Sequence, residues 1–592
     1  MAVVHFNAVV VGSGFGGAVT AFRLAEAGLS VCLLERGKAY PPGSFPRTPR
    51  EMGRNFWQPG AGYYGLFDVR AFRRKLWCLV SSGLGGGSLI DANTLLRKDE
   101  KWFVHEEPDR NGYEYWPVTR ADLDPHYDRV ERMLGAQRYP FETHAPYNST
   151  PKTRQLKYAA EQLGLEWDLL NLAVTFANKG CEPEIGMPIK GPENLHNAPR
   201  FTCRLCGECN LGCNFGSKNS LDLNVLTRAW QCGAEIRTLC EVREIGSRAN
   251  GGYFVRYVEH RENVTAEESR RKHTPPLVEV TADQLILAAG TLGTNELLLR
   301  NRQQFPGISD RLGQRFSGNG NLLTFVFNAR ESRDGTTRPR LLDPSRGPVI
   351  TSAVRVPDTA DGGEGSGFYI EDAGFPLFLE WALEMMQPNA LTRLAAFAGR
   401  SIWSLLSGDP VSNLSRELAR AVGPGALSAS SLPLAGMGRD SATGVLSLRQ
   451  GELNIAWHDS RDSFARVRET AHDIARVWQA DFHGNPIRTL GRAITVHPLG
   501  GCAMGRHAGE GVVDSYGQVF NYPGLSIVDG SVMPGAVGPN PALTIAALAD
   551  RFADRIIETA SRTTTRAIAP DSRTDRHSDA LAQPTEAHTM SD

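Results

Sequence analysis

The chain of 592 residues lacks an excess of charge of either sign, and it lacks long apolar runs. Its formal net charge is −1 at pH 7, so it offers no basic field for nucleic acid or for an anionic membrane. No uninterrupted apolar stretch reaches the length of a membrane span. The apolar stretch at the amino terminus has no basic flank and no small-residue cleavage site, which favours a first β-strand over a signal peptide.

Cysteine is also scarce, whereas glycine is abundant. Ten cysteines in so long a chain are typical of a reducing compartment rather than of a disulfide framework, and we expect a cytoplasmic protein. The 61 glycines and a hydrophobic content of 41% indicate an ordinary globular enzyme rich in turns. The length allows two or more domains with ample core.

Residues 7–37 predict a nucleotide-binding unit of strand, glycine turn, helix and strand. The turn "GSGFGG" supplies Gly12, Gly14 and Gly17 in the GxGxxG spacing, with Phe15 and Gly16 between them. Such glycines let a pyrophosphate approach the backbone at a helix N-terminus. Glu35 ends the second strand, where it can accept the ribose hydroxyls. At this point FAD and NAD both fit.

Three further stretches follow in order: "SSGLGGGSLIDAN" (81–93), "AAGTLGTNELLLR" (288–300) and "HPLGGCAMG" with "DGSVMPGAVGPNPALTIAALADR" (497–551). With them the sequence resembles the glucose–methanol–choline (GMC) family of FAD-dependent oxidoreductases, and within it the cholesterol-oxidase branch. "FSGNGNLLT" (316–324) is also similar to that branch.

The resemblance implies an α/β fold in which a Rossmann-like FAD-binding domain is interleaved with a sheet-based α+β substrate domain. We expect the FAD-binding domain to comprise residues 1–115, 220–320 and 465–562. The substrate domain would comprise 116–219 and 321–464, including the cysteine-rich loop 203–213. The polar segment 563–592 predicts a disordered tail.

The resemblance also implies which residues line the FAD: Gly87, Val242, Ala289, Gly290, Asp529, Gly530, Asn540 and Pro541. One departure is visible, because Asp91 stands where cholesterol oxidases carry an asparagine near the flavin, and Asn93 lies two residues further on. We expect one or both of these side chains to contact the flavin.

Oxidation of an alcohol needs a proton acceptor while hydride leaves carbon for flavin N5. His497 is the candidate acceptor, because imidazole titrates near neutrality and this histidine opens "HPLGGC". Asn540 lies between two prolines that restrict the backbone, which suits an amide held at one angle. In the cholesterol-oxidase branch this position pairs with the histidine.

Glu371 in "GFYIEDAGFP" is a third candidate catalytic residue. If buried, its carboxyl would have a raised pKa and could move protons. In cholesterol oxidases an equivalent glutamate performs the isomerisation of the double bond that follows oxidation. Asp372 and Glu380 compete for this role, and a solvated turn carboxylate remains an alternative.

The substrate pocket is predicted from apolar side chains, which could equally be ordinary core. Candidates that could line a sterol-sized cavity, or form a lid making transient contact with a membrane surface, are Tyr63, Tyr64, Phe67, Phe378, Leu379, Trp381, Met385, Phe397 and Trp403. A large apolar pocket favours a sterol as the alcohol.

"CRLCGECNLGC" (203–213) has the cysteine spacing of a bacterial ferredoxin loop, except that Asn214 replaces the proline. Four cysteines without a neighbouring histidine favour an Fe–S cluster over zinc, with unligated thiols as the alternative. The ligands would be Cys203, Cys206, Cys209 and Cys213.

Three functions remain open. The leading one is FAD-dependent oxidation of a bulky secondary alcohol such as a 3β-hydroxysteroid, with O2 as electron acceptor. The second is a dehydrogenase for a sugar or another alcohol that passes electrons through the cysteine loop to a redox protein or quinone. The third is a non-catalytic FAD-fold protein in which the cysteines form a zinc clip.

Overall fold

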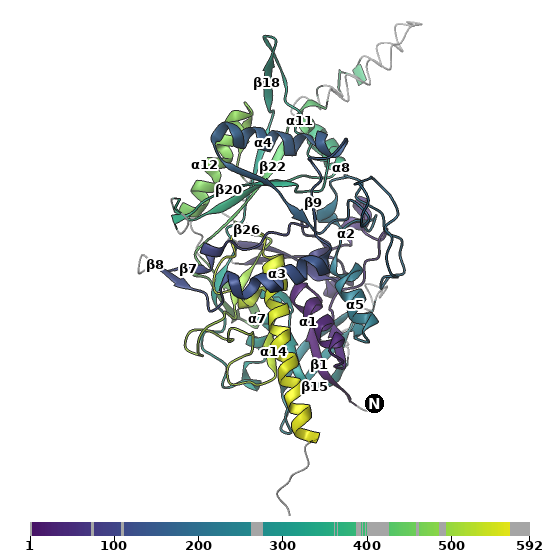
Figure 1. Cartoon of the computed structure of the whole chain (residues 1–592), viewed down its shortest axis with the longest axis vertical. Coiled ribbons are helices and arrows are strands. Elements are labelled where there is room, and N and C mark those ends of the chain that lie inside the picture. The colour runs from purple at the N-terminus through teal and green to yellow at the C-terminus, as the bar shows by residue number, and fades with distance from the viewer. Residues whose placement is uncertain are drawn as a thin grey trace, which may run out of the picture.

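The computed structural model describes residues 3–568, except 73–75, 108–111, 262–275, 360–361, 364, most of 386–424, 458–460 and 485–492. Two β-sheets organise the molecule (Figure 1). One carries the amino-terminal strand in the lower half of the view, and the other lies in the upper half. Within the described residues, every helix is too short or too polar to span a bilayer.

The first sheet has seven strands around a parallel centre. In spatial order they begin β12 (Glu235–Arg237), β2 (Val31–Leu34), β1 (Val4–Val11) and β15 (Leu277–Leu287). On its other edge, β15 pairs with two strands in turn: its first part is antiparallel to β14 (Tyr253–Glu259), and its last part is parallel to β28 (Leu525–Ile527). β14 in turn pairs with β13 (Cys240–Ser247). The central strands are apolar on both faces, as is typical of a covered parallel sheet. The predicted strand–turn–helix–strand unit is therefore confirmed.

Helices α1 (Phe15–Glu26), α5 (Val225–Gln231), α3 (Arg120–Leu134) and α14 (Ala542–Ile568) pack beside one another on this sheet (Figure 1). α3 begins with a Thr-x-x-Asp cap, in which Thr119 and Asp122 satisfy each other's backbone N–H groups. α14 continues to Ile568 and so includes the first six residues of the predicted tail, 563–568. The rest of that tail lies outside the described residues.

The second sheet has six antiparallel strands in the order β10 (Glu166–Leu169), β20 (Ser352–Val356), β21 (Phe368–Asp372), β22 (Leu432–Gly438), β17 (Leu322–Phe327) and β25 (Asp481–His483). α4 (Pro151–Leu163) and α12 (Arg461–Val477) cover one face (Figure 1). α12 buries Phe464, Val467 and Ile474 against that face. The predicted boundary at residue 465 therefore does not follow the packing, because α12 and β25 belong with the second sheet.

Short sheets connect the two large ones. β26 (Ala493–Thr495) pairs with β6 (Leu76–Ser81), which pairs with β5 (Phe67–Phe72). β16 (Gln314–Ser317) pairs with β27 (Leu499–Gly501), so residues 496–498 lie between two paired strands. α7 (Gly290–Arg300) follows β15, and α8 (Leu377–Met385) follows β21. The remaining two-stranded pairs are β3 (Trp57–Gln58) with β4 (Tyr63–Tyr64), β7 (Val104–Glu107) with β8 (Gly112–Tyr115), β9 (Gln137–Arg138) with β11 (Asn171–Leu172), β18 (Arg330–Arg333) with β19 (Thr336–Pro339), and β23 (Val445–Arg449) with β24 (Glu452–Ala456).

A buried ion network joins α1, α3 and α14. Asp550 is fully buried, and its carboxylate pairs with Arg23 of α1 and with His126 and Arg129 of α3. Asp554, one helical turn later and 40% exposed, pairs with the same two arginines. The cationic partners lower the pKa of Asp550 despite its burial.

We expect Asp550→Ala to lower the free energy of unfolding by about 3 kcal/mol, because it removes the one fully buried carboxylate of the network and leaves the largely buried guanidinium of Arg23 with only the more exposed carboxylates as partners. Asp554→Ala is the matched control on the same helix, and its exposed carboxylate predicts a loss below about 1 kcal/mol. Urea unfolding of both variants measures the difference. Equal losses would contradict the importance of burial here.

Candidate active site

A cavity of about 1200 Å³ lies between the two sheets. One wall is the carboxyl edge of the first sheet, where the residues after β1, β2, β15 and β28 meet. The other wall includes strands β17, β21 and β22 of the second sheet. Ligands of open α/β sheets bind at such an edge, so the cavity is the candidate active site.

In the glycine turn after β1, some glycines allow close contact with neighbouring backbone, and another leaves open space facing the cavity. A Cβ atom at Gly16 would lie 1.9 Å from the carbonyl oxygen of Val528, and one at Gly12 would lie 2.3 Å from that of Ala288. A Cβ at Gly14 would meet nothing within 4 Å and would enter the cavity. Gly87 and Gly290, which also line the cavity, leave the same open space. A dinucleotide lying along these three glycines fits the site.

Glu35 lies at the cavity with its carboxylate already held. Oε2 accepts hydrogen bonds from the N–H and hydroxyl of Ser13 at 3.1 and 2.6 Å, and Oε1 accepts from the N–H of Gly37 at 2.8 Å. Ser13 also accepts the N–H of Gly85, which joins the first glycine turn to the second. The carboxylate is thus fixed in direction, with lone pairs left for a ribose hydroxyl.

Asp529, after β28, is anchored in the same way. Its oxygens accept hydrogen bonds from the N–H of Ser531 at 2.9 Å and from the hydroxyl of Thr294 at 2.5 Å. The predicted FAD-lining residues that reach the cavity are Gly12, Gly14, Phe15, Gly16, Glu35, Gly87, Asp91, Val242, Ala289, Gly290, Asp529, Gly530, Asn540 and Pro541. Gly17 instead packs on the backbone of Gly12, and Asn93 is fully buried away from the cavity.

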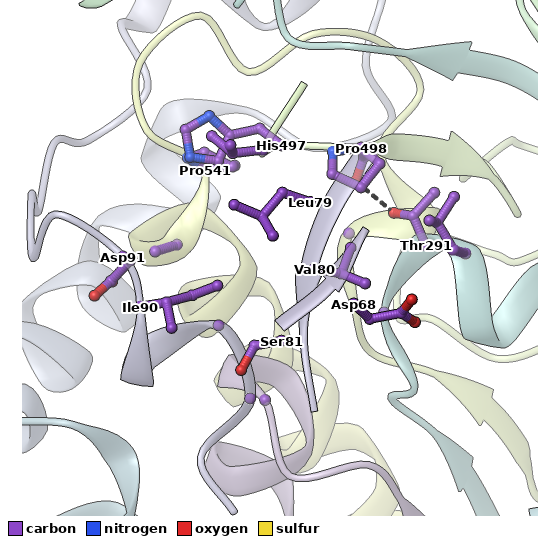
Figure 2. A pocket seen from close by; sticks show the side chains of 18 of the residues that line it. Asp68, Leu79, Val80, Ser81, Ile90, Asp91, Thr291, His497, Pro498 and Pro541 are labelled. Carbon is purple, nitrogen blue, oxygen red and sulfur yellow. Dashed lines mark hydrogen bonds between the residues drawn. The ribbon is translucent and has the colours of Figure 1, made fainter. Parts of the chain in front are cut away.

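The unexpected Asp91 has a cationic partner. Its carboxylate lies 2.8 Å from Nζ of Lys218, which also donates to the backbone carbonyls of Asp91 and Cys209. Burial raises the pKa of Asp91, and Lys218 opposes that shift. Asp91 lines the cavity and Asn93 does not. Asp91 lies on a different part of the cavity wall from His497 (Figure 2).

His497 lies between β26 and β27 and borders the cavity beside Pro541 (Figure 2). The hydroxyl of Thr291 donates to the carbonyl of Pro498 at 2.7 Å and anchors this segment on α7. Asn321 lies 3.1 Å from Nδ1 of the imidazole through its Nδ2, while its Oδ1 accepts the N–H of Val496 at 3.2 Å. Burial lowers the pKa of His497 to about 4, so the ring is neutral at physiological pH.

Glu371 and Asn540 border the same cavity as His497. Alternation along β21 sends Ile370 into the helix-covered core and Glu371 to the cavity face. Within the described residues, neither carboxyl oxygen of Glu371 has a hydrogen-bond partner, and the carbonyl oxygen of the Asn540 side chain has none either. Burial, with Asp372 nearby, raises the pKa of Glu371 well above its usual range, and the Asn540 amide partly opposes this.

The competing carboxylates are engaged elsewhere. Asp372 accepts the N–H groups of Thr351 and Ser352, both at 2.8 Å, and Glu380 does not line the cavity. Of the predicted aromatic and apolar set, Leu379 does line it, whereas Tyr64 packs on Trp57 and Phe67 belongs to a separate core cluster. Phe397, Trp403 and the side chains of Phe378, Trp381 and Met385 lie outside the described part of the chain.

Comparison with known proteins identifies the family. A family model described as GMC oxidoreductase matches residues 6–303, and a second with the same description matches residues 447–549. The chain is a GMC oxidoreductase. Members of this family bind FAD and oxidise alcohols, with an oxidant such as O2. The expected fold and family are therefore confirmed.

Several relatives span most of this GMC oxidoreductase. A cholesterol oxidase of Mycobacterium tuberculosis is 30% identical, covering 93% of this chain and 90% of its own. One of Acinetobacter baumannii is 28% identical over 92% and 93%, and the long-chain-alcohol oxidase FAO4B of Arabidopsis thaliana is 23% identical over 94% and 68%. The solved pyridoxine 4-oxidase from Mesorbium loti has a TM-score of 0.54 at 17% identity, covering 93% of this chain and 98% of its own. That structure shows a shared fold only.

The predicted Fe–S cluster is not supported. In the described part of the chain, one group of three or more His, Cys, Asp or Glu side chains has its ligand atoms all within 4.8 Å of one another. That group is His126, Asp550 and Asp554, which already form ion pairs. The four loop thiols line a space of about 20 Å³, room for about one water. Burial raises the pKa of Cys203, Cys206 and Cys209, so these thiols are neutral on their own.

Other contacts explain the compact cysteine loop. Arg47 pairs with Glu208 at 2.8 Å and donates to the carbonyl of Gly212 at 2.6 Å, and Asn214 exchanges two hydrogen bonds with the backbone of Phe45. Lys218 ties the loop to Asp91. The spacing alone could not reveal these contacts, because Phe45, Arg47 and Asp91 are distant in sequence from the cysteines.

We expect Gly14→Val to weaken FAD binding by tenfold or more, because the new side chain would occupy space along the dinucleotide path without touching the fold. Gly14 has a φ of −67°, so the substitution does not strain the backbone. Gly191→Val is the matched control, since a Cβ there also meets nothing but lies away from the cavity. Titration of the deflavinated proteins with FAD measures affinity, and unchanged affinity for Gly14→Val would contradict the placement.

Proposed function

We propose that this GMC oxidoreductase oxidises the hydroxyl group of a bulky, apolar secondary alcohol, most specifically a 3β-hydroxysteroid. The observation that carries the proposal is the meeting of Glu371, His497 and Asn540 at one cavity whose second-sheet side is largely apolar. Lining residues of that apolar part include Leu323, Phe325, Ile350, Leu379, Leu432 and Met437. Cholesterol oxidases among the relatives support a sterol.

His497 is suited to donate a hydrogen bond to the substrate oxygen. The Asn321 amide nitrogen can only donate, and its orientation follows from Oδ1 accepting the N–H of Val496. Nδ1 of the neutral imidazole is therefore the acceptor, and the ring proton resides on Nε2. This tautomer differs from the role of proton acceptor that the sequence suggested for His497.

Glu371 is then the proton acceptor. Its carboxyl has no competing hydrogen-bond partner among the described residues, and its raised pKa makes the ionised form a strong base. FAD, when bound, supplies the acceptor for the hydride that leaves the alcohol carbon. The alcohol thus loses a proton to Glu371 and a hydride, and becomes a ketone. With a 3β-hydroxy-5-ene sterol, the same carboxyl group can carry the proton that shifts the double bond.

A long-chain primary alcohol is the second candidate substrate, favoured by the long-chain-alcohol oxidase among the relatives and by the same apolar lining. Anaerobic bleaching of the bound flavin by a panel of sterols, long-chain alcohols and sugars distinguishes the candidates. We expect 3β-hydroxysterols to bleach the flavin at the lowest concentrations. Bleaching by long-chain alcohols alone would replace the sterol assignment, and bleaching by none of the panel would remove the proposal.

Because Glu371 must be ionised to accept a proton and its pKa is raised, kcat should increase with pH through a midpoint well above 4.5. The imidazole of His497, with a pKa near 4, stays neutral over that range. We expect Glu371→Gln to lower kcat by ~10²-fold or more and to abolish this limb. Glu384→Gln, at a buried glutamate away from the cavity, is the matched control. An intact limb in Glu371→Gln would reassign the base.

A further inference from the structure

The segment between β16 and β17 carries a buried asparagine that reaches the loop before Asn540. Asn319 is fully buried, with a φ of +55° that asparagine tolerates better than most residues. Its Oδ1 accepts the N–H groups of Val537 at 2.9 Å and Gly538 at 3.0 Å, and its Nδ2 donates to the carbonyl of Pro539 at 3.0 Å. One side chain thus bonds to three successive residues of the loop.

Asn319 is itself held firmly from the second sheet. Its N–H donates to the hydroxyl of Ser317 at 3.0 Å, and Ser317 in turn donates to Asp440, which follows β22. The carboxylate of Asp440 also accepts the N–H of Gly318 at 2.8 Å. Asn319 is therefore held at a fixed position relative to β22, and its hydrogen bonds hold the loop at a fixed position relative to β22 as well.

The loop is fixed on its other sides as well. Lys98 donates to the carbonyls of Ala536 and Val537 at 2.9 and 2.8 Å. Gly538 has a φ of +97°, and a Cβ there would lie 2.6 Å from the ring of Trp102. Of the three restraints, only Asn319 bonds to Pro539, the residue that immediately precedes Asn540.

We propose that Asn319 is a positioning residue that sets the angle of the Asn540 amide at the cavity and thereby the environment of Glu371. The carbonyl oxygen of the Asn540 side chain has no hydrogen-bond partner among the described residues, so its direction depends on the backbone that Asn319 holds. The proposal rests on the function proposed above, because its effect on turnover needs Glu371 to act as the base.

The test is a double-mutant cycle with Asn319→Gly and Asn540→Ala. Glycine keeps the positive φ and removes the three hydrogen bonds. We expect Asn319→Gly to slow anaerobic flavin reduction by ~10- to 10²-fold at saturating alcohol. In the Asn540→Ala background the same substitution should change the rate by less than about twofold. Both single variants should also shift the pH midpoint of kcat upward, because each withdraws the amide that lowers the pKa of Glu371.

Two controls separate positioning from general stability. Asn301, a buried asparagine outside the cavity lining, bonds to the backbone of Arg243 and Leu297 rather than to the loop before Asn540, and provides Asn301→Gly. This variant should lose stability without a shift in the pH midpoint. Should Asn319→Gly fail to fold, Asn319→Asp keeps the positive φ and the acceptor oxygen but loses the amide donor to Pro539. Independent, multiplicative losses in the cycle, or an unmoved pH midpoint, would overturn the proposal.

The failure of the proposed function would look different. If no alcohol reduces the flavin of the unmodified protein, the proposed chemistry fails, and the loop is then assessed by amide hydrogen exchange. Faster exchange at Val537 and Gly538 in Asn319→Gly than in Asn301→Gly would uphold the positioning role. Equal exchange in the two variants would remove it.

Discussion

The hydrogen bonds of residues 317–321 are the constraint on which the geometry of the site depends. This segment leaves β16, which pairs with β27 beside His497, and enters β17 of the second sheet. Asn321 bonds to the segment carrying His497, and Asn319 bonds to the loop carrying Asn540. Five residues therefore connect the second sheet with the segments that carry His497 and Asn540, so a shift of these five residues would affect both side chains.

Electrostatics divides the work between His497 and Glu371. Burial acts on both, but in opposite directions, because it disfavours the cation of one and the anion of the other. A neutral imidazole with its proton directed away from Asn321 can donate, and a buried carboxyl whose raised pKa is opposed only in part by the Asn540 amide becomes a strong base once ionised. The cavity obtains a donor and an acceptor from two groups that would both be ionised in water at pH 5.

Sequence reasoning reached much of this arrangement, because the parallel sheet makes local motifs converge. The glycine turn, Glu35, Asp529 and Gly290 each follow a buried strand, so reading strands predicts their meeting at one edge. The asparagines at 319 and 321 escaped assignment, since their partners lie about 180 to 220 residues away. The boundary at 465 failed for a similar reason: the apolar face of α12 does not specify which sheet it covers.

The cysteine loop shows where spacing is weaker evidence than environment. Metal ligation needs thiolates converging on a space large enough for the metal, whereas the loop thiols surround a space for one water, and burial raises the pKa of Cys203, Cys206 and Cys209. Lys218, which holds the carbonyl of Cys209, holds Asp91 at the cavity wall as well. The four cysteine side chains pack around a small space, whereas a metal site with four thiolate ligands would place negative charge there. The loop therefore supports Lys218, and Lys218 supplies the positive charge that Asp91 requires at the cavity.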